Sequence, residues 1–305
     1  MAFTFLAQKR IAKDIKNYIN SDLNTVGIYC HIDESNIQDI KALIIGPKNT
    51  PYENGFYFFN IHFPNDYPFS PPKVKFLTYE YGIRFNPNLY TNGKVCLSIL
   101  GTWSGPGWTT VLNLNTVLLS IQSLLNEFPL QNEPGFENET GKKSVDYTTV
   151  IEYSNVKTAT IKNLETPPEG FGVFKETMIE HFIKNIDFYR NYIHKNKKKN
   201  NSSLTSTIYS MNIQCNLDFI NERIKFNYEK YTNELQATND ELKTVNTNQE
   251  KDKKTIEKKK RKCPNIMAKM YDVGVIKLSE NDNKHYKVIQ INGPKRTMKR
   301  WVLNK

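Results

Sequence analysis

Hydrophobic and polar positions follow two different periods along the first half of the chain. Near the N-terminus the apolar residues recur at helical spacing, which predicts a helix with one face formed by Leu6, Ile11, Ile15, Tyr18 and Ile19. Four short strand-like runs follow, namely GIYCHI, IQDIKALIIG, GFYFFNIHFP and KVKFLT. Turn signals at Gly46-Pro47 and Asn54-Gly55 separate neighbouring runs. Because short turns join neighbouring strands, the pattern predicts a four-stranded antiparallel meander.

The periodicity is interrupted twice before helices return. The proline-rich stretch PNDYPFSPPK excludes both a helix and a continuous ladder. From Tyr79 to Asn115 there is little periodicity, and a loop of this length inside a compact domain is usually functional. TVLLSIQSLLNE then has the spacing of a buried helix face, and two further helices are predicted over roughly 144–164 and 173–194. This order of elements indicates an α+β domain.

Composition bounds the compartment and disfavours two kinds of site. The 305 residues suffice for one large domain or two unequal ones, and 38% of them are hydrophobic. No run of 18 apolar residues occurs, so no membrane span is expected, and the start MAFTFLAQKRIAKDI does not resemble a secretory signal. Neither a metal site nor a disulfide framework is expected, because no C-x-x-C pair occurs among Cys30, Cys96, Cys215 and Cys263. This cysteine usage favours a cytoplasmic or nuclear location.

The basic residues are concentrated in the last third of the chain. Residues 197–305 contain 24 Lys and Arg against 12 Asp and Glu, whereas the residues before them contain 18 against 19. This shift predicts a domain boundary near residues 193–203. The chain is therefore divided into a domain at 1–195, a polar basic linker at 196–262 with a helix over NLDFINERIKFNYEKYTNELQ, and a small module with strand-like alternation at 263–305.

One cysteine lies inside the long loop, in the segment FNPNLYTNGKVCLSIL. A lone cysteine in an apolar run such as VCLSIL is usually a packed core residue. Asn88 precedes Cys96 by eight residues, an Asn-Gly turn lies between them, and no histidine stands nearby to act as a base. From these residues alone, Cys96 is either core packing or a nucleophile that works without the usual partner.

Three segments together resemble the ubiquitin-conjugating enzymes. They are IIGPKNTPYENGFYFFNIHFPNDYPFSPPKVKFLT, FNPNLYTNGKVCLSIL and LLSIQSLLNE, and their order and spacing agree with the family over most of residues 1–165. GTWSGPGW, NEPGF and HFIKNIDFY resemble one branch, which includes the giant apoptosis-inhibitor conjugating enzyme and the enzyme charged by the alternative ubiquitin-activating enzyme. The resemblance implies the α+β ubiquitin-conjugating fold, with an N-terminal helix, a four-stranded meander, a long active-site loop and C-terminal helices, in an extended catalytic domain of residues 1–195.

The resemblance implies roles for two residues of the loop. Cys96 falls on the family's active cysteine, which carries ubiquitin as a thioester and passes it to a lysine; a thiol exchanges with a thioester without a histidine base. Asn88 falls on the asparagine that organises the active loop and donates to the developing oxyanion, with a plain turn residue as the alternative. The family usually has His-Pro-Asn here, whereas this chain has Asn86-Pro87-Asn88, and the named branch also tolerates asparagine at the first position.

The resemblance also implies a gate residue and a binding surface. The gate falls on Asn132 or Glu133, where a carboxylate would orient the incoming lysine, and a solvated loop carboxylate is the alternative for Glu133. The surface for the activating enzyme and ligases falls on the first helix, Phe69 and the loop 104–108, including Pro106 and Trp108. The implied partners are ubiquitin, an activating enzyme, ligases and lysine-bearing substrates. No bound cofactor and no metal are expected, because ATP is used upstream by the activating enzyme.

Two other functions are compatible with parts of the sequence. A non-catalytic, ubiquitin-binding variant of the fold is disfavoured, because such variants lack the cysteine that this chain keeps. The main alternative is a nucleic-acid-binding or virion-associated protein acting through the basic run KDKKTIEKKKRK, which also fits a solvated tether or a nuclear-import patch. SENDNKHYKV and NGPKRTMKRWV resemble a short C-terminal module in proteins of large DNA viruses, which suggests a viral origin.

Overall fold

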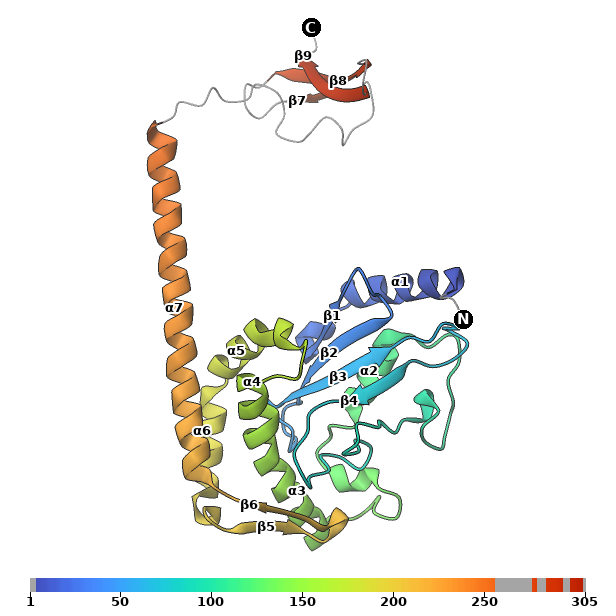
Figure 1. The fold of residues 1–305 in the computed structure, drawn as a ribbon, viewed down its shortest axis with the longest axis vertical. Helices are drawn as coiled ribbons and strands as arrows, with labels where there is room; N and C mark the ends of the chain where they lie inside the picture. The colour runs from blue at the N-terminus through green and yellow to red at the C-terminus, as the bar shows by residue number, and fades with distance from the viewer. Residues whose placement is uncertain (1–3, 256–275, 279–283, 293–296, 304–305) are drawn as a thin grey trace. The chain divides into compact units, whose positions relative to one another are not determined.

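The chain divides into two units. A computed structural model describes residues 4–255, 276–278, 284–292 and 297–303. Contacts between residues separate a unit at 1–234 from a unit at 235–305 (Figure 1). Among the described residues, none of the helices is both long and apolar enough to cross a bilayer. All the residues considered as site candidates in the long loop belong to the first unit.

The first unit is built on an antiparallel sheet of four strands. The strands are β1 (Ile28–Ile32), β2 (Asp39–Ile45), β3 (Phe56–His62) and β4 (Lys73–Phe76), in the order β1-β2-β3-β4. In this register Leu43 pairs with Phe58, and Phe59 pairs with Phe76. The predicted meander is confirmed, because the four strand-like runs pair in sequence order.

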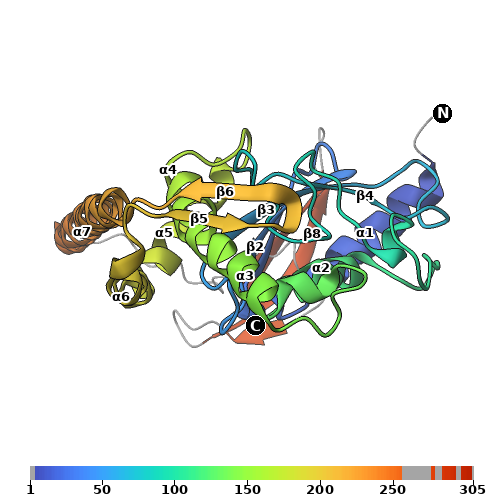
Figure 2. The same cartoon turned by 90° about the horizontal axis from the view of Figure 1, so that it is seen from below.

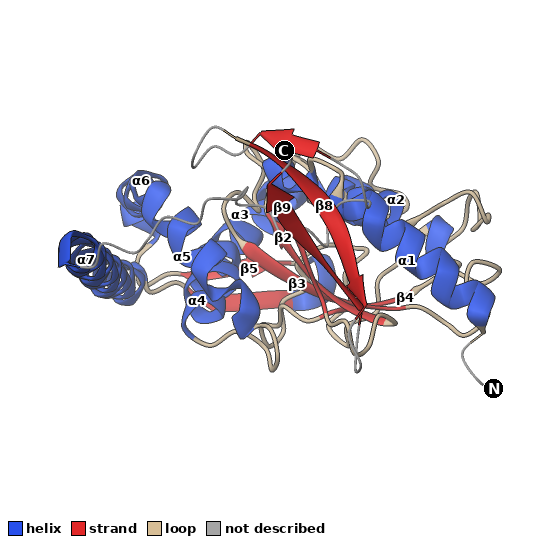
Figure 3. Ribbon diagram, turned by 90° about the horizontal axis from the view of Figure 1, so that it is seen from above, coloured by secondary structure: helices blue, strands red, loops and turns tan. Residues whose placement is uncertain are grey.

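Both faces of β3 are buried. Tyr57 and Phe59, on one face, pack against Phe76 with ring centroids 6.5 and 5.3 Å away. On the other face the ring of Phe58 lies 5.2 Å from that of Phe171. Helix α1 (Phe5–Ile19) lies on one side of the sheet, and the helices α4 (Asn163–Glu165), α5 (Lys175–Lys184) and α6 (Ile186–Asn196) lie on the other (Figure 3). The segments after the long loop therefore complete the core rather than extend from it.

The N-terminal helix α1 is present, but its buried face differs from the expected one. Thr4 caps it by accepting a hydrogen bond from the backbone N–H of Ala7. Of the predicted face, Ile11 is buried and Ile15 and Tyr18 pack against the core, whereas Leu6 and Ile19 are 54% and 67% exposed. The buried positions are Ala7, Ile11 and Asp14. The Asp14 carboxylate can be buried because Arg10 and the hydroxyl of Tyr67 hold it.

Further helices follow the long loop. They are α2 (Leu114–Ser123), α3 (Lys142–Ser154), a π-helical stretch at Asn155–Lys162, α4 (Asn163–Glu165), α5 (Lys175–Lys184) and α6 (Ile186–Asn196). Short 3₁₀ turns lie at Leu23–Val26, Ser98–Leu100, Pro129–Asn132, Gly172–Phe174, Lys197–Lys199 and Ile208–Ser210. The helix predicted at 173–194 is divided at Asn185, whose backbone and side-chain amides both donate to the carbonyl of His181 and cap α5.

The first unit continues well past the predicted boundary at residue 195. The strands β5 (Ser203–Ser206) and β6 (Met211–Gln214) form a hairpin that packs on α3 (Figure 2). The helix α7 (Leu217–Thr255) follows and includes the predicted helical segment. Residues 196–234 are therefore part of the first unit rather than of a linker. The polar composition of this region does not reveal the hairpin. Its buried residues are single positions that alternate with exposed ones, at Leu204, Ser206, Met211 and Ile213.

The second unit contains a small antiparallel sheet within the region predicted as a strand-like module. Its strands are β7 (Ile276–Leu278), β8 (His285–Asn292) and β9 (Thr297–Leu303), in the order β7-β8-β9. Val288 and Trp301 are paired across β8 and β9, and both are buried. Cross-strand pairs of a β-branched and an aromatic residue stabilise such small sheets.

Ending the chain at residue 195 should destabilise the first unit, whereas ending it at residue 234 should not. The shorter fragment loses the packing of Leu204, Met211, Ile213 and Leu217, each buried in the intact unit. Burying one large apolar side chain contributes about 1.5–3 kcal/mol, so we expect the melting temperature of the 1–195 fragment to fall by about 10 °C or more. Thermal unfolding followed by circular dichroism measures both fragments against the full chain. Equal melting of the two fragments would contradict the role given to residues 196–234.

Candidate active site

Cys96 lies in the loop between β4 and α2, where backbone bonds fix it from one side. Its N–H donates to the carbonyl of Asn88 at 2.9 Å. The Thr102 hydroxyl donates to the carbonyl of Val95 at 2.7 Å and accepts from the N–H of Leu97 at 3.0 Å. Each neighbour of Cys96 is thus tied to the same hydroxyl. Cys96 itself is 1% exposed, so an approaching thioester requires the covering residues to move.

The structure brings Asn88 directly against the backbone of Cys96. Its side-chain amide donates to the Cys96 carbonyl at 2.8 Å, and its own N–H donates to Oδ1 of Asn86 at 2.9 Å. An asparagine amide carries two donor hydrogens, so one remains in addition to the hydrogen that this bond uses. The Oδ1 atom of Asn88 is buried and has no hydrogen-bond partner among the described residues. Asn88 therefore holds the loop at the cysteine with its donor side.

Asn86, which stands where the family usually has histidine, is fully buried, and both polar atoms of its side chain form hydrogen bonds. Its amide nitrogen donates to the Tyr52 hydroxyl at 2.9 Å and to the Leu124 carbonyl at 2.7 Å, while its oxygen accepts from Asn88. Burial raises the pKa of Tyr52, which keeps this phenol protonated as a donor to the carbonyl of Phe85 at 2.7 Å. The asparagine thus satisfies a buried network, and its presence does not disrupt the loop.

The two candidate gate residues follow one another at the end of a short 3₁₀ turn. Asn132 donates to the Leu124 carbonyl at 3.2 Å, the same oxygen that accepts from Asn86, and accepts from Asn126 at 3.0 Å. Glu133 accepts a hydrogen bond on Oε2 from the Tyr209 hydroxyl at 2.5 Å. Asn132 is therefore connected to the cysteine loop through one shared carbonyl, whereas Glu133 is held by the β5–β6 hairpin.

Tyr209 was not among the residues singled out in the sequence. It lies 76 positions after Glu133, in a stretch that reads as polar linker. The two short alternating runs SLTS and MNIQ, on either side of Tyr209, could have indicated the hairpin.

The candidate surface for partner enzymes is arranged around the proline-rich stretch. Trp108 donates its indole N–H to the Pro68 carbonyl at 2.7 Å, and its ring lies 5.8 Å from that of Tyr67. Phe69, next in sequence, is 68% exposed, and Pro106 is also exposed. Trp108 thus anchors its loop beside the stretch while Phe69 and Pro106 remain available for contact.

The other cysteines are in environments that oppose nucleophilic chemistry. Burial raises the pKa of the Cys30 thiol to about 12, and burial also raises that of Cys215. Cys263 lies outside the described residues. No cluster of histidine, cysteine, aspartate or glutamate suited to a metal occurs in the described ranges.

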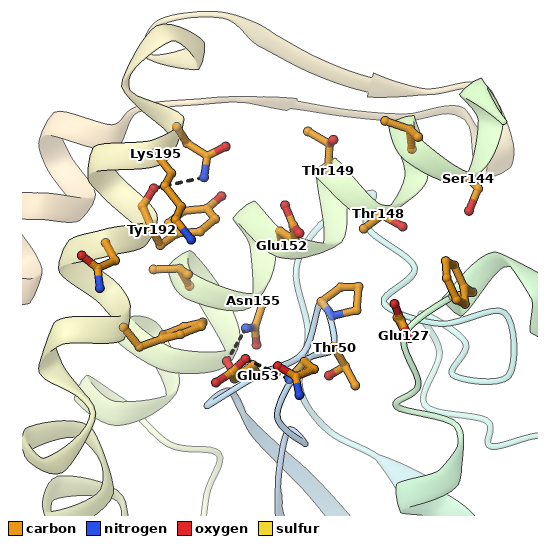
Figure 4. A pocket seen from close by; sticks show the side chains of 18 of the residues that line it. Thr50, Glu53, Glu127, Ser144, Thr148, Thr149, Glu152, Asn155, Tyr192 and Lys195 are labelled. Carbon is orange, nitrogen blue, oxygen red and sulfur yellow. Dashed lines mark hydrogen bonds between the residues drawn. The ribbon is translucent and has the colours of Figure 1, made fainter. Parts of the chain in front are cut away.

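Of three cavities in the described part of the first unit, the smallest adjoins the cysteine loop and the two larger ones do not. A cavity of about 760 Å³ between the β2–β3 turn, α3 and α6 is lined by Thr50, Thr148 and Glu152 among others, and by none of the predicted site residues (Figure 4). Burial raises the pKa of Glu152 there. A smaller cavity of about 460 Å³ is lined by Lys94, Thr102 and the proline-rich stretch. The chemistry is thus expected beside the smaller cavity.

Comparison with known proteins shows what the first unit of this chain is similar to. Residues 10–154 match the family model "Ubiquitin-conjugating enzyme". The chain is 42% identical over 182 residues to ubiquitin-conjugating enzyme E2 Z of Xenopus tropicalis, covering 59% of this chain and 58% of that protein. It is 41% identical over 186 residues to E2 Z of Homo sapiens, covering 59% of this chain and 51% of that protein.

Another relative is named as both a conjugating enzyme and a ligase. The chain is 41% identical over 175 residues to the human dual E2 ubiquitin-conjugating enzyme/E3 ubiquitin-protein ligase BIRC6. The alignment covers 52% of this chain and 4% of that protein. The chain spans about half the length of the E2 Z relatives it matches. None of these relatives has a name that supports the alternative of a nucleic-acid-binding or virion-associated protein.

Proposed function

We propose that this chain accepts ubiquitin from an activating enzyme as a thioester on Cys96 and transfers it to a lysine of a substrate protein, since residues 10–154 match the ubiquitin-conjugating family model. The observation that carries the proposal is the pair of hydrogen bonds between Asn88 and Cys96, in which each residue donates to the other's backbone carbonyl. This arrangement holds Cys96 in a single register, and the family resemblance implies that the thioester forms at this position.

The reaction consists of two acyl transfers on the same sulfur. In the first, the Cys96 sulfur attacks the carbonyl carbon of the incoming thioester, the new C–S bond forms and the thiol of the activating enzyme leaves. In the second, a lysine amine attacks the Cys96 thioester, an amide bond forms, the amine loses a proton and the Cys96 thiol is regenerated. Both steps pass through a tetrahedral oxyanion, and neither needs a cofactor bound to this chain.

The polar groups around Cys96 supply positioning and charge stabilisation. The second amide hydrogen of Asn88 is suited to the developing oxyanion, since the first already holds the loop. The Glu133 carboxylate attracts the lysine ammonium and accepts its proton as the amine attacks, and Asn132 supports the same turn. Phe69, Pro106 and Trp108 form the surface for the activating enzyme and ligases.

Finer assignments follow from the same resemblance. The branch is that of E2 Z and BIRC6, since both match over more than half of this chain. The chain is also proposed to function in the cytoplasm or nucleus. The free thiols Cys30, Cys96 and Cys215 fit a reducing compartment. The viral origin rests only on the C-terminal segments quoted above, of which residues 279–283 and 293–296 lie outside the described part.

A charging assay tests the proposed function. The full chain is incubated with ATP, ubiquitin and each of two activating enzymes in turn, and related modifiers replace ubiquitin in parallel reactions. We expect a band larger by one ubiquitin on non-reducing gels, and loss of that band when a thiol reductant is added. A folded chain that accepts no modifier, in reactions that charge a known conjugating enzyme, would overturn the proposal.

A further inference from the structure

The turn of the β5–β6 hairpin has an unusual backbone. Tyr209 and Ser210 have φ values of 57° and 50°, in the left-handed region that residues other than glycine and asparagine seldom adopt. A strained conformation of this kind persists only where surrounding contacts hold it, and such sites are often functional. The contacts of Tyr209 therefore indicate which residues hold the turn in this conformation.

The ring of Tyr209 contacts an arginine that precedes the cysteine loop. The guanidinium carbon of Arg84 lies 4.2 Å from the centroid of the Tyr209 ring and 3.6 Å from that of Tyr90. The backbone N–H of Arg84 donates to the sulfur of Met211 at 3.3 Å, and Tyr147 on α3 donates to its carbonyl at 2.7 Å. The hairpin thus fixes both the side chain and the backbone of Arg84.

Arg84 in turn supports the loop that holds Cys96. Its guanidinium donates a short hydrogen bond to the carbonyl of Pro87. Pro87 directly precedes Asn88, whose side chain donates to the Cys96 carbonyl. A chain of three contacts therefore runs from the hairpin to the candidate nucleophile.

The hydroxyl of Tyr209 contacts the second of the two candidate gate residues. It donates to Oε2 of Glu133 at 2.5 Å. Burial raises the pKa of Tyr209, so the phenol stays protonated and remains a donor over the physiological range. A carboxylate has two oxygens, so Oε1 can accept from a lysine ammonium while Oε2 is held by the tyrosine.

We propose that Tyr209, on the segment beyond the matched family domain, is a positioning residue for the transfer step: its hydroxyl fixes the Glu133 carboxylate that receives the incoming lysine, and its ring fixes Arg84 beneath the cysteine loop. The inference rests on the proposed function, because it concerns transfer from the Cys96 thioester. On this proposal the extension, residues 196–234, contributes a positioning residue to the active site. The competing interpretation is that the hairpin only stabilises α3.

The decisive variant is Tyr209→Phe, which keeps the ring against Arg84 and removes the hydroxyl. The full chain and each variant are charged with ubiquitin, the activating enzyme is stopped, and the loss of thioester is followed over a series of lysine concentrations. We expect charging to be unchanged and discharge to lysine to slow about tenfold in kcat/KM, the factor that corresponds to about 1.4 kcal/mol. The slowing should come mainly from a higher KM for lysine. Hydrolysis without lysine should be unchanged, because water needs no oriented ammonium partner.

A double-mutant cycle shows whether Tyr209 acts through Glu133. Glu133→Gln should slow discharge to lysine about tenfold or more, and Tyr209→Phe combined with Glu133→Gln should be no slower than Glu133→Gln alone. Tyr209→Ala should slow discharge further than Tyr209→Phe and should also lower the melting temperature, whereas Tyr209→Phe should melt like the unaltered chain and still discharge slowly. Tyr228→Phe is the matched control, since Tyr228 also lies in the extension under an arginine, with the Arg190 guanidinium 5.1 Å from its ring. We expect Tyr228→Phe to behave as the unaltered chain.

The outcomes separate this inference from the function on which it rests. An unaltered chain that never charges contradicts the proposed function. An unaltered chain that charges and discharges, with Tyr209→Phe equal to it at every lysine concentration, overturns the positioning role. Additive effects in the double variant also overturn it, because they would show that the hydroxyl does not work through Glu133.

Discussion

Cys96→Ala should abolish the ubiquitin adduct, and Cys96→Ser should give at most an ester that resists thiols. The reason is chemical, since alanine has no nucleophilic atom and a serine oxygen forms an ester that thiols exchange far more slowly than a thioester. Cys96 is already packed within the loop, and its backbone bonds to Asn88 do not involve the sulfur. The alanine variant should therefore remain folded, which circular dichroism checks before the charging gel is run.

Alanine at each of the other cysteines provides the control for this result. Cys30 and Cys215 have thiols whose pKa is raised by burial, so they should contribute little thiolate near neutral pH. Variants of Cys30, Cys215 and Cys263 should all keep a thiol-sensitive adduct. An adduct that persists in Cys96→Ala would show that the carrier has been assigned to the wrong residue.

The sheet could be predicted because its signals are local, whereas the roles of Asn88 and Cys96 came from the family resemblance. The alternating runs pair in sequence order, so each strand lies beside its neighbour in the chain. The spacing of Asn88 and Cys96 corresponds to two mutual hydrogen bonds across eight residues. In both cases the residues that interact are close enough in the sequence for their pattern to be recognised together.

The extension could not be predicted because its contacts are long-range. Tyr209 reaches Glu133 across 76 positions, and Met211 reaches Arg84 across 127. Each contact depends on how α3 carries the hairpin back to the loop, which periodicity does not encode. The composition of residues 196–262 also misled, because lysine and asparagine are abundant around a few singly spaced buried residues. The apolar periodicity of α1 also did not indicate that Asp14 is buried, because its partner Tyr67 lies 53 positions away.

Asn88→Ala should separate the two steps of the reaction. Charging exchanges one thioester for another, so its free energy is nearly balanced and the activating enzyme supplies much of the site. Transfer to lysine passes through an oxyanion on this chain's own loop, where a preorganised donor matters most. We expect charging to stay within a few-fold, and discharge to free lysine to slow by roughly 100-fold, the loss typical of one oxyanion donor. Quenched time courses on non-reducing gels measure both rates.

The structure sharpens this test, because the Asn88 amide also holds the Cys96 carbonyl at 2.8 Å. Alanine removes that bond and leaves a buried carbonyl without its donor, at a cost of about 1–3 kcal/mol. Asn88→Asp should be slow as well, since a carboxylate cannot donate and repels the developing negative charge. Asn92→Ala is the matched control, because Asn92 lies in the same loop, is exposed and bonds only to the backbone of Lys94 among the contacts described. If charging and discharge fall together in Asn88→Ala, the residue acts by holding the loop. If a folded, charged variant discharges at the original rate, both roles given to Asn88 are wrong.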